Sequence, residues 1–313
     1  MPEGPTVQWR PTGSIGTLRL RAALQAKIRR YFAERAVIEV TTPMLTPTGV
    51  TEPMIQSLML KDARYFLRTS PEYYHKRLLA AGFGDLYEMG PVMRAGEEGR
   101  LHHPEFTMLE WYRVGLNWEQ LAEEALDLVK HCSELVELSW RSRTVSWQTL
   151  FVEILGFDPL SIEGAALRQL TDSLPLDCDR SMRLDYLFAT RLQSRLPDDQ
   201  LTIVHHYPAS QAALAELDPM DARFARRFEV FAGSVELANG YQELRDESEQ
   251  ARRFADDNQR RRALGLPEMP IDQRLLAALA HGLPNCSGIA LGVDRLLMIM
   301  TGAKAMSEVV AFS

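Results

Sequence analysis

The stretch from Tyr87 to Tyr112 constrains the fold of this 313-residue chain more than any other segment. Two strand-like segments flank a polar loop of about ten residues, whereas an ordinary hairpin loop has two to five. Because residues two apart share one face of a strand, Phe106, Met108 and Glu110 should line one surface together with Tyr112. The sequence therefore predicts an antiparallel pair of strands that presents an aromatic ring, a carboxylate and a phenol beside a loop long enough to close over a ligand.

Arg94 ends the first of these two strands. A guanidinium at that position could clamp a phosphate or a carboxylate through two parallel hydrogen bonds. With the flat ring of Phe106 on the neighbouring strand, this arrangement indicates a nucleotide site.

Composition narrows the class of protein. With 46% hydrophobic residues the chain can bury a large core, and we predict one domain over residues 1–313. A net charge of −7 argues against a broad nucleic-acid surface, since neutralising phosphates requires clustered Lys and Arg. Cys132, Cys178 and Cys286 lie far apart, and no apolar run approaches the ~20 residues of a membrane span. We expect a cytoplasmic protein without a zinc site, a disulfide framework or a membrane partner.

Three segments together resemble the three signature motifs of class II aminoacyl-tRNA synthetases. Residues 30–45 are similar to motif 1, residues 102–112 to the lysyl-tRNA synthetase version of motif 2, and residues 288–296 to motif 3. The resemblance implies an α+β fold with a mainly antiparallel sheet flanked by helices, and a homodimer formed through motif 1. It also implies an insertion between motifs 2 and 3, and residues of roughly 115–200 are predicted to be largely helical. Residues 1–16, rich in Pro, Gly and Thr, should form an irregular lead-in.

Residues 228–240 predict a hairpin that turns at residues 233–234. In that register Glu229 faces Ala238 and Phe231 faces Glu236, which makes the two glutamates diagonal neighbours roughly 7 Å apart. Such carboxylates repel each other unless a cation lies between them, and Mg²⁺ bound to nucleotide phosphates would fit. In isolation the pair could equally be a solvent-exposed edge.

The residues that follow favour the metal hypothesis. Glu236, Asn239 and Glu243 occur in a string that is similar to one in lysyl-tRNA synthetases. Gly240 is predicted to permit a bulge that turns Asn239 and Glu243 inward. In the motif 3 segment, Gly288 and Ala290 share a small-residue face with Gly292, a pattern that is also typical of tight sheet packing.

The resemblance implies roles for individual residues. Arg94 and Arg295 would be the catalytic residues, with Arg295 stacked on adenine opposite Phe106. The residues implied to contact ATP are Arg94, Ala95, Gly96, His103, Phe106, Glu236, Leu237, Gly292 and Arg295. The residues implied to contact the amino acid are Ser70, Pro71, Glu72, Glu110, Tyr112, Asn239, Glu243 and Ala290. Mg²⁺ would bind at Glu229 and Glu236.

Three pocket carboxylates, those of Glu72, Glu110 and Glu243, suit a substrate with two ammonium groups. The carboxylate of that substrate would meet Arg94 and Asn239.

The chain departs from the lysyl-tRNA synthetase pattern at several positions. Ser70 and Ala290 stand where Ala and Gly are usual, which should reshape the pocket near the substrate amino group. Gly96 replaces a glutamate that normally contacts ATP, and Glu97 or Glu98 could substitute for it. His103 replaces an asparagine.

Motif 1 begins within about thirty residues of the start, so we expect no anticodon-binding domain before it. A chain with Ser70 and Ala290 in the pocket and no expected anticodon-binding domain resembles the bacterial lysyl-tRNA synthetase paralogues that attach (R)-β-lysine to elongation factor P. The resemblance implies activation of β-lysine, and more weakly of α-lysine, by ATP and Mg²⁺, followed by transfer to a lysine of that factor, with no tRNA as partner. Two alternatives remain open at this stage, a minimal tRNA-charging enzyme and a non-catalytic paralogue that binds an amino acid.

Overall fold

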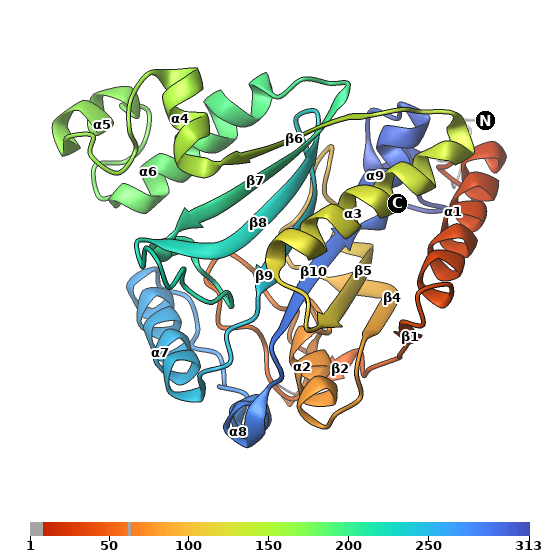
Figure 1. Ribbon diagram of the computed structural model, residues 1–313, viewed down its shortest axis with the longest axis horizontal. Coiled ribbons are helices and arrows are strands. Elements are labelled where there is room, and N and C mark those ends of the chain that lie inside the picture. The colour runs from red at the N-terminus through yellow and green to blue at the C-terminus, as the bar shows by residue number, and fades with distance from the viewer. Residues whose placement is uncertain (1–8, 62–63) are drawn as a thin grey trace, which may run out of the picture.

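The computed structural model describes residues 9–61 and 64–313 (Figure 1). Within these residues eight strands form one mixed sheet in the order β1-β4-β5-β10-β9-β8-β7-β6. Pairing is antiparallel except at the two ends, where β1 pairs with β4 and β6 with β7 in parallel. The predicted α+β class with a mainly antiparallel sheet is confirmed. The strands are β1 (Ile38–Glu39), β4 (Leu86–Met93), β5 (Glu105–Val114), β6 (Arg141–Ser146), β7 (Gln200–Pro208), β8 (Phe224–Ala232), β9 (Val235–Gln242) and β10 (Cys286–Gly292), with β2 (Leu45–Thr46) and β3 (Phe66–Leu67) in a separate small pair.

Helices flank this sheet on both sides. They are α1 (Ile15–Ala33), α2 (Glu72–Ala80), α3 (Trp118–Ser133), α4 (Trp147–Leu155), α5 (Gly164–Leu170), α6 (Arg180–Leu187), α7 (Glu247–Ala263), α8 (Gln273–Gly282) and α9 (Val293–Thr301). Apolar side chains of α1, α3 and α9 pack on one face of β5, β8, β9 and β10 to form the main core. Leu109 and Trp111 belong to this core, so β5 turns its alternate residues, including Glu110, toward the opposite face.

The N-terminal segment only partly tests the predicted lead-in. Residues 1–8 lie outside the described residues, and α1 begins at Ile15 after Ser14, whose side chain accepts a hydrogen bond from the Thr17 amide. A serine at this position satisfies one of the amides that a helix start leaves without a partner. Across the described part of the chain, no helix combines the length and the apolar composition needed to cross a membrane.

The segment between motifs 2 and 3 contains helices α4, α5 and α6, but it also contributes a strand that the sequence analysis did not foresee. Strand β6 extends the sheet beside β7. A second apolar cluster, which includes Trp147, Phe151 and Phe188, joins these helices to Phe231 of β8. The insertion is therefore built onto the sheet rather than attached by a flexible stalk.

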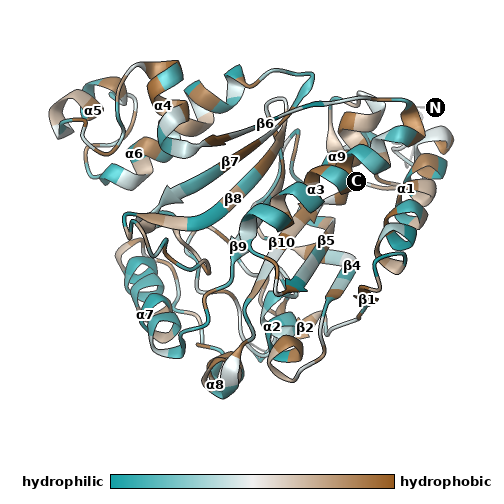
Figure 2. Ribbon diagram, viewed as in Figure 1, coloured by the Kyte–Doolittle hydropathy of each residue, from teal (hydrophilic) through white to brown (hydrophobic). Residues whose placement is uncertain are grey.

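Helix α7 is mostly hydrophilic in Figure 2. Its inner side nevertheless buries Gln250, Phe254, Asn258 and Arg261. This buried side brings α7 against the cavity described below.

Two irregularities shift the register at one end of the sheet. The hairpin turns between Ala232 and Val235, as predicted, but Leu237 is an extra residue in β9, so Glu229 faces Asn239 and not Ala238. In β7 the register shifts again between His205 and Tyr207, at a residue, His206, whose φ is +57°.

The bulge predicted at Gly240 is wrong. Gly240 keeps regular pairing with Phe228 and Ile289. A Cβ at this position would lie 2.4 Å from Cζ of Phe228, so the glycine is needed for close packing of that ring.

Candidate functional site

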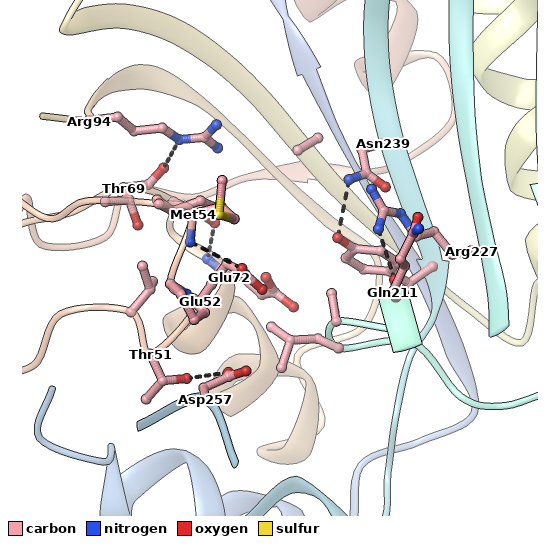
Figure 3. Close-up of a pocket in the computed structure, with 18 of the residues that line it drawn as sticks. Thr51, Glu52, Met54, Thr69, Glu72, Arg94, Gln211, Arg227, Asn239 and Asp257 are labelled. Carbon is pink, nitrogen blue, oxygen red and sulfur yellow. Dashed lines mark hydrogen bonds between the residues drawn. The ribbon is translucent and has the colours of Figure 1, made fainter. Parts of the chain in front are cut away.

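One cavity of about 1500 Å³ opens on the face of the sheet opposite the main core. Its walls come from β5, β9 and β10, the start of α2, the loop before β3, and parts of α6 and α7. Figure 3 shows Arg94 and Thr69 on one side of the cavity and Arg227 and Asn239 on the other. All the predicted site residues line it except Pro71, Ala95 and Gly96.

The floor of the cavity depends on a missing side chain. A Cβ on Gly288 of β10 would lie 2.3 Å from Cε1 of Tyr112 and 2.4 Å from Oε1 of Glu243. The small-residue face of β10 thus allows tight packing against this strand. That packing brings a phenol and a carboxylate to the cavity.

Ser70 organises one pocket carboxylate. Its hydroxyl donates to Oε2 of Glu110 at 2.8 Å and accepts from the backbone amide of Glu72 at 3.0 Å, which starts α2. Tyr112 donates to Oε1 of Glu110 at 2.8 Å. Glu110 is therefore held in one orientation from two sides.

The other two pocket carboxylates share a buried cation that the sequence analysis missed. Nζ of Lys76 lies 2.7 Å from Oε1 of Glu72 and 2.7 Å from Oε2 of Glu243, and its side chain is fully buried. Burial raises the pKa of Glu72 and of Glu243 against the attraction of Lys76. Burial alone would lower the pKa of Lys76, but the two carboxylates outweigh it and raise that pKa above its usual value.

A second buried base, His75, lies beneath Glu110. Its Nε2 is 3.0 Å from Oε2 of Glu88, and its Nδ1 is 3.4 Å from Oε1 of Glu110. Burial lowers the pKa of His75, but the two carboxylates outweigh it, so the net shift is upward. Arg68 lies 2.6 Å from Glu88, and hydrogen bonds from His75, Thr42 and Arg68 overcome burial and lower the pKa of Glu88 to about 2.

At the far side of the cavity, Arg94 and Phe106 lie together. The guanidinium carbon is 5.3 Å from the ring centroid, and Nε donates to the Thr69 carbonyl at 3.4 Å. Gly96 has φ +75°, a conformation that favours glycine. The turn at Gly96 carries Glu97 to within 3.5 Å of Arg94 on the cavity wall, which supports the hypothesis that Glu97 replaces the missing glutamate.

Arg295, at the start of α9, is held by four groups, one of which is the Leu101 carbonyl, 3.4 Å from its Nε. Its Nη1 donates to the backbone carbonyl of Glu236 at 3.0 Å and lies 3.5 Å from that residue's carboxylate. Its Nη2 is 2.9 Å from Nε2 of His102. Burial and the nearby Arg295 charge lower the pKa of His102, which keeps this imidazole neutral and able to accept. His102 was missed in favour of His103, whose Nδ1 instead lies 2.8 Å from the Glu105 carbonyl.

The acidic pair is not an open pair of carboxylates. Glu229 is bound by Nη2 of Arg227 at 2.6 Å and by the hydroxyl of Tyr207 at 2.6 Å, and neither partner was predicted. The Glu236 carboxylate is partly exposed, and among the described residues its only ion pair is the 3.5 Å contact with Arg295. Mg²⁺ commonly takes one or two carboxylates in addition to phosphate oxygens, so Glu236 fits that role directly, while Glu229 would have to share its oxygens. The described residues contain no group of three or more His, Cys, Asp or Glu side chains arranged for a metal ion.

Asn239 leaves one acceptor unused. Its Nδ2 donates to the hydroxyl of Tyr241 at 3.2 Å, and its buried Oδ1 has no hydrogen-bond partner in the described part of the chain. A buried acceptor without a partner is costly, and this atom lies on the cavity wall. A ligand ammonium or amide group would satisfy it.

Comparisons with known proteins identify the family of this chain. Residues 5–313 match the model of the class II tRNA synthetases (D, K and N). The chain is 43% identical to the elongation factor P–(R)-β-lysine ligase of Photorhabdus laumondii, over 98% of each chain. It is also 43% identical to the proteins of that name from Yersinia pestis strain Pestoides F and Yersinia pseudotuberculosis serotype O:1b, again over 98% of each chain. The chain belongs to the class II tRNA synthetase family and, within it, to the group of the elongation factor P–(R)-β-lysine ligases.

Proposed function

We propose that this ligase activates (R)-β-lysine with ATP and transfers it to a lysine ε-amine of elongation factor P. The observation that carries the proposal is the division of one cavity into two ends. Glu72, Glu110 and Glu243 form an acidic end, whereas Arg94 and Arg295 form a basic end. An amino acid with two ammonium groups and a carboxylate matches this polarity when its carboxylate points toward the arginines.

ATP would occupy the basic end. The ring of Phe106 offers a flat surface for adenine, and Arg295 also lines the cavity. Glu236 would hold Mg²⁺, with Glu229 as the second carboxylate, and this ion would supply positive charge to the phosphates. Binding ATP in this way places its α-phosphate between the two arginines and the acidic end.

The chemistry consists of two substitutions. A carboxylate oxygen of β-lysine attacks the α-phosphorus, the bond to the β-phosphate breaks, and pyrophosphate leaves. Arg94 and Arg295 stabilise the negative charge that develops on the phosphate oxygens. The ε-amine of the acceptor lysine then attacks the carbonyl carbon of the adenylate, AMP leaves, and an amide forms after the amine loses a proton. Positioning of the reactants supplies much of the acceleration.

Two observations oppose the alternatives. A tRNA-charging enzyme needs cationic contacts to a polyanion, and this chain carries a net charge of −7. A non-catalytic paralogue has no need for both arginines, yet Arg94 and Arg295 both line the cavity.

The decisive experiment separates the two acceptors. The protein is incubated with ATP, Mg²⁺ and (R)-β-lysine, together with elongation factor P in one reaction and bulk tRNA in another. We expect one β-lysyl group to be added to the factor, measured by intact mass, and no aminoacylated tRNA. Acylated tRNA with an unmodified factor would refute the proposal in favour of a minimal synthetase. ATP–pyrophosphate exchange with lysine, (R)-β-lysine and ornithine ranks the amino acids.

We also propose a homodimer formed through the motif 1 region. Ile38, Met44 and Leu45 are large apolar residues that the single chain leaves exposed by 51%, 38% and 47%. Light scattering should give twice the mass of the chain, and a monomer at micromolar concentration would refute this part. A cytoplasmic location stays a prediction.

A further inference from the structure

Two buried bases of α2 lie directly behind the pocket carboxylates. His75 and Lys76 are both fully buried, and neither lines the cavity. A substrate in the cavity therefore contacts the carboxylates but not these bases. Nothing in the implied mechanism uses either residue.

Lys76 carries a fixed charge. Its ammonium contacts Glu72 and Glu243 at 2.7 Å each, and both carboxylates stabilise its charged form. It therefore cancels one of the negative charges that Glu72, Glu110 and Glu243 contribute when they are ionised.

The charge of His75, by contrast, depends on protonation of its ring, and the two carboxylates that face it raise its pKa above the ordinary value. The groups that face its ring are Glu88 on β4 and, on β5, Glu110 and the edge of Tyr112, whose ring centroid is 5.4 Å away. The charge of Glu88 is already balanced by Arg68. When His75 is protonated, its extra charge therefore acts mainly on Glu110, and when it is neutral Glu110 is left free for a ligand cation.

We propose that His75 and Lys76 are positioning residues that set the net charge of the acidic end of the cavity, and that protonation of His75 weakens the binding of a diamino acid. When Glu72, Glu110 and Glu243 are all ionised and His75 is neutral, three carboxylates and one ammonium leave two net negative charges, one for each ammonium group of the substrate. With His75 protonated, one net negative charge remains. The inference rests on the proposed function and adds the residues that set the charge its substrate meets.

The direction of the change in diamine binding distinguishes this role from a purely structural one. Protonated His75 competes with a substrate ammonium for Glu110, so replacing it with a neutral residue should improve diamine binding where the histidine is protonated. The two carboxylates that face His75 raise its pKa above the ordinary 6.5, so this gain should be largest at the acidic end of the pH range and should shrink as the pH rises. Glu72 and Glu243 also titrate in this pocket, because burial raises their pKa values, so the comparison must be made between variants at each pH.

The experiment measures KM and kcat for (R)-β-lysine in ATP–pyrophosphate exchange from pH 6 to 9 for the wild type and His75→Gln. His281→Gln, which changes an exposed histidine of α8, is the matched control. At pH 6.5 we expect the KM of His75→Gln to be several-fold, up to roughly tenfold, below that of the wild type. The difference in KM between the two proteins should shrink as the pH rises, and 3-aminohexanoic acid, which has one amine, should show a smaller difference. His281→Gln should follow the wild type throughout.

The outcomes separate the two proposals. If the wild type shows no exchange with any diamine, the proposed function fails. If the wild type is active but His75→Gln has the same KM profile, or a KM raised equally at every pH, the inference alone is overturned. Should His75→Gln not fold, NMR titration of the seven histidine rings in the wild type replaces it. The His75 ring should then titrate at lower pH once β-lysine is bound, and no such change would overturn the inference.

Discussion

Gly288→Ala should damage both the stability and the acidic end of the cavity. The added Cβ would meet Tyr112 at 2.3 Å and Glu243 at 2.4 Å, distances that no Cβ contact tolerates. Both neighbours are more than 97% buried, so neither can simply move into solvent. The strand or the two side chains must shift.

The magnitude follows from these contacts. Overpacking of a well-packed interior typically costs about 1–3 kcal/mol. In a chain of this length that corresponds to a decrease in Tm of roughly 2–10 °C. Because Glu243 and Tyr112 belong to the proposed substrate pocket, we expect KM for (R)-β-lysine to rise by about 10 to 200-fold, the range for one methyl-sized misfit.

Thermal unfolding followed by circular dichroism, together with ATP–pyrophosphate exchange, tests both parts. Gly292→Ala on the same strand is the control for stability, because a Cβ there has its nearest contacts at 3.6–3.7 Å, all with Arg295. Its Tm should remain within about 2 °C of the wild type. If Gly288→Ala melts like the wild type and keeps its KM, the close packing described for the cavity floor is refuted.

Four further predictions concern single residues. Arg295→Ala should reduce exchange by at least about 10²-fold with little change in Tm, and near-normal exchange would contradict its role at the phosphates. Glu236→Gln should shift the Mg²⁺ titration of exchange to higher concentration, whereas an unchanged titration would place the ion elsewhere. Ala290→Gly should increase the preference for α-lysine over β-lysine by about 10 to 200-fold, as measured by the ratio of kcat/KM values. The pKa of Glu88 is lowered from 4.5 to about 2, so this group adds stability above pH 4.5 that is lost as the pH falls toward 2. Glu88→Gln should therefore be less stable than the wild type at neutral pH. Its Tm should also decrease less steeply between pH 4.5 and pH 2.

The sequence predicted the parts of the site that depend on local pattern. Alternation along a strand placed Phe106, Glu110 and Tyr112 on one face, and the small residues of β10 marked the cavity floor. These assignments succeed because the side-chain period of a strand is independent of the rest of the fold.

What the sequence could not predict are the buried partners of the pocket carboxylates. His75 and Lys76 lie on an amphipathic helix, where charged residues are normally assigned to the solvent side. Their burial depends on carboxylates of β4, β5 and the segment after β9, and no local pattern encodes those distances. Strand β6 was missed for a related reason, since four of its six residues are exposed and give almost no apolar signal. The extra residue at Leu237 likewise cannot be read from alternation, and it moved Glu229 opposite Asn239.

The two register shifts at this end of the sheet also limit how the protein can change in length. Tyr207, Arg227 and Glu229 line the cavity, and the register of β7 and β8 shifts between His205 and Tyr207. Since a one-residue slip turns every later side chain of a strand to the opposite face, deleting a regularly paired residue such as Val230 would turn charged groups of β8 toward the main core and apolar ones away from it. Divergence within this family should therefore replace residues in β7, β8 and β9 while keeping their spacing, and insertions and deletions should be confined to loops such as the one between α5 and α6.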